Sequence, residues 1–379
     1  MADYSTYSTD PLMLGQRVVA ILETGLRTAT YKLATLMALI DHCIEHLPDD
    51  PTATLRVPIP DLAHRILEIY WRQIRPFDGQ ELRQSTQPKA RILLAAKNFR
   101  TVAGIGEGNA SLELAISRAP DSYTVAIDEI SLCLAQQPLH RLQRLPGAAA
   151  SDTFLYDDSF LHDSVSRSWL RAHGDAIELK PGVAYGLARL AGLLKPALEI
   201  MWVDDVRRMN KFLEADVPDV AGHLFGRERT ALAAVREPFK DTFGPHCFYC
   251  RAQLPPNNPI DHVLPWSLVG IDGLANLVLA CARCNGDKRQ GLPAVEIVDR
   301  VLARDRDALE DIASLIQWPT QYQRVVAAAR GLYRGQPAGV PTWSGYQHST
   351  RLDITYPRWW IQVDVAADQS ASPSSDRGT

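Results

Sequence analysis

Two closely spaced cysteine pairs place the strongest constraint on the fold of this chain. The pairs are Cys247-Phe-Tyr-Cys250 and Cys281-Ala-Arg-Cys284. In each pair two residues separate the thiols, so both sulfur atoms can reach one metal ion from a tight turn. Two such turns complete the tetrahedral sulfur shell that zinc prefers in structural sites. The sequence therefore predicts a structural zinc site that holds residues 245–290 together.

Residues of a different chemistry lie between the two pairs. Asp261 and His262 are adjacent, Asn276 follows in an Asn-Leu-Val-Leu run, and Asn285 comes directly after the last cysteine. An imidazole, a carboxylate and two amides supply a base and hard oxygen ligands, which hydrolysis uses and a structural zinc site does not need. We therefore predict a hydrolytic site formed by these four residues.

The stretch from Cys247 to Lys288 resembles the HNH endonuclease motif of the ββα-metal class, in the subgroup with a four-cysteine zinc site. The resemblance is carried by the Asp-His pair followed by an apolar pair and Pro265, by Asn276, and by the Cys-x-x-Cys-Asn run. It implies a hairpin that carries the Asp-His pair and packs against a helix starting near the second cysteine pair. It also implies that Asn276 holds the hairpin loop, and that cleavage leaves 5′-phosphate and 3′-hydroxyl ends. Asn285 stands where the family name implies histidine.

The chemistry of phosphodiester hydrolysis gives these residues roles. An imidazole with a pKa near neutrality can accept a proton from water, which makes His262 the predicted general base. Asp261 and Asn285 offer hard oxygen atoms, which suit Mg²⁺ or Mn²⁺ and leave room for water ligands. We expect a catalytic Mg²⁺ or Mn²⁺ in addition to the structural zinc.

Basic side chains follow the second cysteine pair. We expect Lys288 and Arg289, about one helical turn into the predicted helix, to contact phosphate oxygens, with Arg283 adding charge nearby. DNA is the expected substrate. Two neighbouring residues are given structural roles: His246 as a loop histidine outside the zinc shell, and Trp266 as a cover for the zinc core, with stacking on a nucleobase as the alternative.

The composition excludes some classes of protein. A formal net charge of -4 argues against coating nucleic acid by bulk electrostatics, so phosphate binding must come from local basic patches. Of the six cysteines, Cys43 and Cys133 fall in apolar helical patterns and are predicted to be buried thiols. Residues 1–11 are polar, and no stretch is a membrane span, which predicts no membrane partner and a reducing cytoplasm.

Apolar periodicity predicts an α+β chain: a mainly helical N-terminal region, followed by a zinc-stapled ββα-metal domain with flanking helices. Residues 16–47 are predicted to form one or two helices, and Pro196 is predicted to interrupt a helix at 183–211. Further helices are predicted at 61–74, 88–99, 123–134, 139–145, 227–239, 293–315 and 321–333. Strands are predicted at 153–156, 176–179 and 356–363.

The same patterns divide the chain. Residues 1–150 are predicted to be a mainly helical region for recognition, partner binding or oligomerisation, and 151–226 a mixed α/β connecting region. Residues 227–335 form the expected nuclease domain, 336–365 a strand-like segment, and 366–379, rich in Ser, Ala and Asp, a disordered tail.

These observations favour a metal-dependent HNH endonuclease that acts on DNA, in restriction or anti-phage defence by family resemblance. The alternative is a non-catalytic, zinc-stabilised module that binds nucleic acid or protein in a larger assembly. A homodimer, a regulatory protein partner and a required activator all stay open. Sequence preference must be encoded outside residues 245–290, because the motif contacts phosphate and metal rather than base edges.

Overall fold

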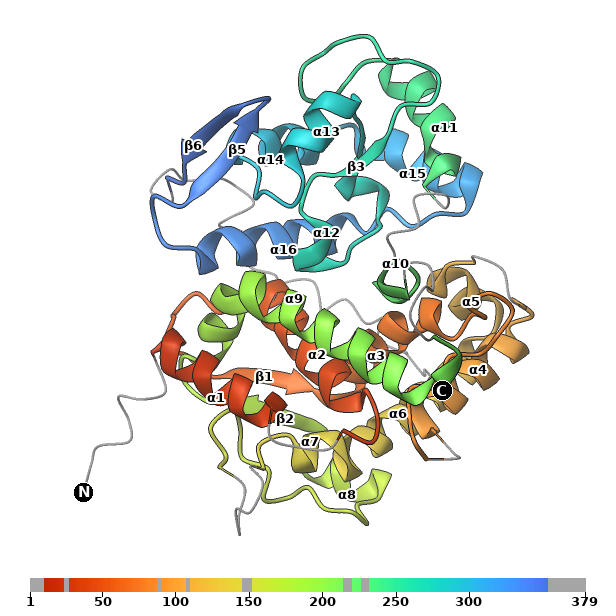
Figure 1. The fold of residues 1–379 in the computed structure, drawn as a ribbon, viewed down its shortest axis with the longest axis vertical. Helices are drawn as coiled ribbons and strands as arrows, with labels where there is room; N and C mark the ends of the chain where they lie inside the picture. Colours follow the sequence, from red (N-terminus) through yellow and green to blue (C-terminus); the bar gives the residue numbers. More distant parts are fainter. Residues whose placement is uncertain are drawn as a thin grey trace, which may run out of the picture.

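The computed structural model describes residues 10–23, 27–87, 90–106, 110–144, 152–213, 220–225 and 232–353. Helices dominate these residues, and their strands form three antiparallel pairs, so the fold is α+β as predicted. Figure 1 shows an N-terminal lobe, residues 10–225, below a C-terminal lobe, residues 232–353. None of the described helices combines the length and the apolar character that crossing a membrane requires.

Helix α2 (Tyr31–Glu45) forms the centre of the N-terminal lobe. Every residue of α2 except Lys32 is buried, so protein covers its whole circumference. Helices α3 (Ile59–Gln73), α7 (Pro138–Arg141) and α9 (Val183–Met209) pack against it. The other elements of this lobe are α1 (Pro11–Glu23), β1 (Leu55–Pro58), α4 (Arg91–Val102), α5 (Leu112–Arg118), α6 (Pro120–Gln136), α8 (Arg167–Ala172), β2 (Ala176–Leu179), η2 (Lys211–Leu213) and α10 (Val220–Phe225).

Segments far apart in the sequence share the core of this lobe. Strand β1 pairs with β2 in antiparallel register, with Leu55 opposite Leu179. Helix α9 packs against both α1 and α2. Residues before and after position 150 therefore contribute to one hydrophobic core.

The C-terminal lobe contains a short hairpin followed by a helix. Strand β3 (Ile260–His262) pairs with β4 (Leu277–Leu279), and α13 (Ala282–Lys288) follows β4 directly. This is the ββα order that the resemblance implies. The other elements are α11 (Ala233–Phe243), α12 (Trp266–Val269), η3 (Leu274–Asn276), α14 (Val295–Leu302), α15 (Arg306–Ile316), α16 (Tyr322–Gly335), β5 (Pro341–Gly345) and β6 (His348–Arg351).

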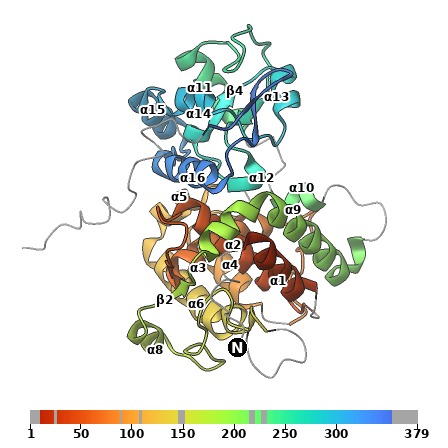
Figure 2. The same ribbon diagram turned by 90° about the vertical axis from the view of Figure 1, so that its left-hand side faces the viewer.

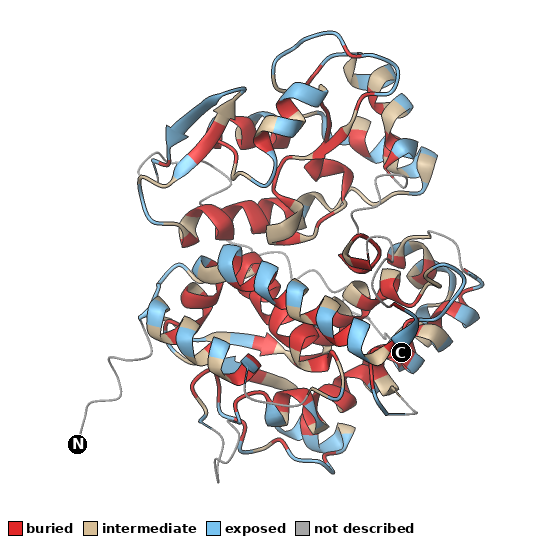
Figure 3. Cartoon of the chain, in the orientation of Figure 1, coloured by how far each residue is buried: buried red, intermediate tan, exposed pale blue. Residues whose placement is uncertain are grey.

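The lobes meet where α16 packs against α2 and α9, and α12 against α9 (Figures 1 and 2). Buried residues make up most of α2 and α16, two of the helices that meet there (Figure 3). The contact is closest at Gly331, where an added Cβ would lie 1.7 Å from the Ile44 carbonyl oxygen. Only glycine permits this approach of the two backbones.

Ion pairs across the same boundary fix the orientation of the lobes. Arg324 of α16 binds Glu45 at 2.9 Å and Glu68 at 2.6 Å, and Arg330 binds Asp49 at 2.5 Å. All but Asp49 are largely shielded from solvent. Partly buried pairs of this kind constrain geometry more than they add net stability, because desolvation offsets much of their attraction.

Most predicted helices are confirmed, with α3, α6 and α16 close to their predicted bounds and α1 with α2 realising the two-helix alternative. Three predictions were wrong. Helix α9 runs through Pro196 without a break, although proline has no amide hydrogen to donate to the Gly192 carbonyl oxygen. Residues 293–315 form two helices, because the Asp305 side chain caps α15. In place of a strand at 153–156, Tyr156 makes a single bridge to Leu179.

Other predictions concern residues that are not described. The predicted strand at 356–363, the tail at 366–379 and the start of the helix at 227 lie outside the described residues. Within 336–353 the structure contains the β5–β6 hairpin.

Replacing Gly331 by alanine should destabilise the protein. The methyl group would collide with the Ile44 backbone, and overpacking of this kind lowers the free energy of unfolding by about 1–3 kcal/mol. Urea unfolding of the variant and the parent measures the difference. Gly286→Ala is the control, because a Cβ there meets nothing within 4 Å. Equal midpoints for Gly331→Ala and the parent would contradict the close contact.

Candidate active site

The four cysteines of the two pairs come together beside the hairpin. Cys247 and Cys250 lie in a turn after α11. The amide of Phe248 in this turn donates to the Leu279 carbonyl oxygen of β4 at 2.9 Å and so ties the turn to the hairpin. Cys281 and Cys284 lie at the start of α13. Four thiolates bound to one zinc ion at about 2.3 Å lie about 3.8 Å apart. The four sulfur atoms lie within 4.8 Å of one another, and Cys250 Sγ is 3.8 Å from Cys281 Sγ, so the cluster fits such an ion.

His262 ends β3, and its ring contacts the loop that leads to β4. Nε2 lies 2.7 Å from Asp272 Oδ1, and the ring centroid lies 5.2 Å from that of Trp266. Asp272 also forms an ion pair with Arg72 of α3, so its carboxylate is ionised and only accepts hydrogen bonds. Nε2 therefore carries the proton, and Nδ1 keeps a lone pair.

The surroundings of His262 keep its ring uncharged. Burial, followed by the positive charges of Lys288 and Arg72, lowers the pKa of His262 to about 3. This corrects the near-neutral pKa expected from the sequence: at pH 7 the ring is neutral and Nδ1 keeps its lone pair, but burial makes the ring a weaker base than an exposed imidazole.

Asn276 is fully buried and closes the loop between the two strands. Its Oδ1 accepts from the Leu264 amide at 2.8 Å, and its Nδ2 donates to the carbonyl oxygens of Leu264 and Ile271 at 3.2 and 3.1 Å. These three bonds join the two ends of the segment that follows His262. This geometry is what the expected loop-holding role requires.

Asp261 is buried beside α13, where two groups hold one of its oxygen atoms. Oδ2 accepts from the Tyr249 hydroxyl at 2.5 Å and lies 3.2 Å from Lys288 Nζ. Burial and the charge of Asp261 raise the pKa of Tyr249, so its hydroxyl keeps the proton that it donates. Lys288 also donates to the His262 carbonyl oxygen at 2.6 Å, which ties α13 to both residues of the Asp-His pair.

The position of Lys288 corrects the expectation that it lies on a phosphate-binding surface. Its side chain is 1% exposed and points into the lobe. The reason is helical geometry: Lys288 lies four residues after the buried Cys284, and residues with this spacing share one face of a helix. Arg283 and Arg289 are exposed, and the Arg283 guanidinium lies 4.7 Å from the centroid of the Tyr346 ring.

Asn285 lies on a neighbouring face of α13. It lines a hollow of about 390 Å³ together with Ile260, Asn258 and Arg236. Asn258 Oδ1 is buried there without a hydrogen-bond partner among the residues that the structure describes. The structure thus brings Asp261, His262 and Lys288 into direct contact, and it places Asn285 beside the start of β3.

The sequence did not reveal Asp272 and Arg72 as partners of His262, or Tyr249 as a partner of Asp261. Asp272 lies between His262 and Asn276 in the chain, but a lone aspartate in a loop gives no signal by itself. Arg72 lies in the other lobe, and no local pattern could have found it. Trp266 packs on His262 and donates to the Phe225 carbonyl oxygen at 2.8 Å, so the prediction that it covers the cysteines was wrong.

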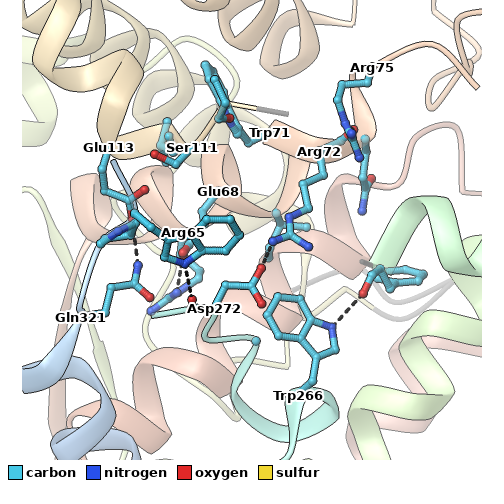
Figure 4. A pocket seen from close by; sticks show the side chains of 18 of the residues that line it. Arg65, Glu68, Trp71, Arg72, Arg75, Ser111, Glu113, Trp266, Asp272 and Gln321 are labelled. Carbon is cyan, nitrogen blue, oxygen red and sulfur yellow. Dashed lines mark hydrogen bonds and ion pairs between the residues drawn. The ribbon is translucent and has the colours of Figure 1, made fainter. Parts of the chain in front are cut away.

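Two other residues near the site lie outside the cysteine cluster and the hairpin. His246 is exposed and is not part of the four-cysteine cluster. Figure 4 shows that Arg72 reaches Asp272 beside Trp266. The predicted buried thiols Cys43 and Cys133 are confirmed.

Comparison with known proteins identifies two regions. Residues 13–224, more than half of the chain, match a domain of unknown function (DUF8808). Residues 247–294 match an HNH endonuclease model, and this range contains the cysteine cluster, the hairpin and α13. No curated protein and no solved structure matches the chain. The chain therefore belongs to the family defined by this domain of unknown function, and it carries an HNH endonuclease domain at residues 247–294.

Proposed function

We propose that this chain is a metal-dependent endonuclease that hydrolyses phosphodiester bonds in DNA. The observation that carries the proposal is the geometry of His262: Asp272, paired with Arg72, orients the ring through Nε2 and leaves the lone pair of Nδ1 as the proton acceptor. Attack of water on a phosphodiester needs such a base. The proposed products are the 5′-phosphate and 3′-hydroxyl ends that the resemblance to HNH endonucleases implies.

Asp261 and Asn285 are the proposed ligands of Mg²⁺ or Mn²⁺. Tyr249 and Lys288 hold Oδ2 of Asp261, and Oδ1 is a second carboxylate oxygen. The hollow at Asn285 adds the Asn258 oxygen, which lacks a partner among the described residues. Hard oxygen donors are those that these cations prefer. The bound cation would shield the charge that grows on the phosphoryl oxygens and on the leaving group.

Zinc is the proposed ion of the four-cysteine cluster, with a structural role. The hairpin and α13 are short elements, and a closed thiolate site would supply the stability that so few residues cannot supply by packing alone. Lys288 supports the same unit from inside, because its ammonium joins α13 to β3.

The wider assignment rests on the exposed charges and on the resemblance. Arg283, exposed on α13, and Arg289, exposed just after its end, are the proposed phosphate contacts. We assign 227–335 to the nuclease domain and the N-terminal lobe to recognition of a target, partner or signal. Restriction of invading DNA in the cytoplasm is the proposed setting. A homodimer would supply the two sites that paired cuts in a duplex need.

Purified protein should nick supercoiled plasmid DNA in the presence of Mg²⁺ or Mn²⁺. EDTA should stop the reaction, and Mg²⁺ added back should restore it. His262→Ala should lower the rate by about 10²–10⁴-fold, because it removes the proton acceptor. Gel analysis of plasmid nicking at several times measures the rates.

His246→Ala is the matched control, because this histidine is exposed and lies in the same lobe. It should cut at the parental rate. If His262→Ala cuts as fast as the parent, His262 is not the base. DNA binding by the parent without cleavage under any of these conditions would favour the alternative of a non-catalytic binding module.

The purified parent should contain one zinc ion per chain, and Cys250→Ser should lose it. Without the ion the hairpin and α13 should unfold locally, which lowers the melting temperature. Metal analysis and thermal melting measure both effects. Cys133→Ala is the control, because this thiol lies in the N-terminal core and its loss should leave the zinc content unchanged. A Cys250→Ser protein with full zinc content would exclude the thiolate site.

A further inference from the structure

An arginine of the N-terminal lobe contacts the surroundings of the nuclease histidine. Arg72, near the end of α3, forms an ion pair with Asp272 Oδ2, while Asp272 Oδ1 lies 2.7 Å from His262 Nε2 (Figure 4). Arg72 also lies over the Trp266 ring, 5.2 Å from its centroid, and Trp266 packs on His262. These two contacts therefore lead to the same imidazole.

The loop that carries Asp272 is held from several sides. Trp318 donates to the Asp272 carbonyl oxygen at 2.7 Å, and Trp266 donates to the Phe225 carbonyl oxygen of α10 at 2.8 Å. The first bond holds the backbone at Asp272, and the second holds the Trp266 ring against α10. The direction of the Asp272 carboxylate depends on its two partners, Arg72 and His262.

We propose that Arg72 is a positioning residue for the nuclease reaction, and that the N-terminal lobe thereby completes the active site of the C-terminal lobe. This inference rests on the proposed function. Arg72 holds Asp272 with one oxygen atom turned toward His262, which fixes the ring and its Nε2-H tautomer. Nδ1 is then directed toward the attacking water, whose proton it accepts. Arg72 does not touch the imidazole itself in these contacts; it acts on His262 through Asp272 and through the Trp266 ring.

The geometry explains why an arginine suits this position. A guanidinium is always charged, is planar, and presents several donors at once, so it can bind the carboxylate and lie over the indole ring together. The ion pair also keeps Asp272 ionised and therefore a pure acceptor, which selects the tautomer of His262. A lysine would keep the charge and lose the planar contact.

A cavity of about 450 Å³ lies beside this ion pair, between the lobes. Arg72, Asp272, Trp71, Trp266 and Trp318 are among the residues that line it. Truncating Arg72 would enlarge this cavity. A free guanidinium ion could then enter and bind Asp272 in place of the missing side chain.

The test measures plasmid nicking by the full-length, zinc-containing protein with Mg²⁺. Arg72→Ala should lower kcat by about 10²-fold with KM unchanged, because a misplaced base costs rate and not substrate binding. Arg72→Lys should recover part of the loss, and millimolar guanidinium should rescue Arg72→Ala with saturation. Arg334→Ala is the matched control: it removes another ion pair between the lobes, with Asp49, and should keep the parental kcat.

A second measurement does not depend on cleavage. Nitrogen-15 NMR of histidine-labelled protein reports the tautomer of each ring, and the signal missing in His262→Ala identifies His262. The parent should show the Nε2-H form, and Arg72→Ala should show mixed tautomers, while Arg334→Ala should resemble the parent. An inactive parent with these spectra would count against the proposed function and still support the role of Arg72.

Several results would overturn the inference. Parental kcat in Arg72→Ala would exclude a positioning role. A raised KM with kcat unchanged would mean that Arg72 contacts the substrate. Faster cleavage would mean that Arg72 restrains the reaction. Equal losses in Arg72→Ala and Arg334→Ala would mean that general docking of the lobes is what matters. An unchanged His262 tautomer in Arg72→Ala would contradict the proposal whatever the cleavage rates.

Discussion

The close approach of α16 to α2 is the constraint on which the relation of the two lobes depends. Gly331 lies against the Ile44 carbonyl, and this spacing lets Arg324 reach Glu45 and Glu68 of the N-terminal lobe. The contact belongs to a fully buried helix, so a shift there would move an entire core element. The contact between α16 and α2 also sets the position of α3 relative to the hairpin. In that position Arg72 of α3 forms its ion pair with Asp272.

The charged groups around the Asp-His pair are arranged for orientation rather than for stability. Lys288 is almost fully buried between Asp261 and the His262 carbonyl, and Asp272 lies between His262 and Arg72. Removing such charges from water costs about as much as their attraction returns. Their benefit is directional: each ionised group accepts or donates in one fixed sense, so the ring of His262 has one preferred tautomer and one preferred orientation.

The course of the helices could be predicted where apolar periodicity is uninterrupted, as in α3 and α16. It could not be predicted where a local signal competes with packing. Pro196 disfavours a helix interior, yet α9 continues through it and packs along its length against α1, α2 and α16. At Asp305 the local signal prevails instead. Its side chain caps the start of α15 and divides into two helices a segment that apolar periodicity alone predicts to be one. Short apolar runs such as 153–156 are ambiguous, because strand formation needs a partner of matching register.

The sequence by itself determined the cysteine cluster, the Asp-His pair, Asn276 and the order of hairpin and helix, because these depend on spacing along one short stretch of chain. Only the tertiary structure decided which groups face these residues. Lys288 points inward because of the face of α13 on which it lies, and Tyr249 and Asp272 meet their partners through turns whose direction is set by packing. Arg72 belongs to another lobe, and no spacing rule links residues brought together by the docking of two cores.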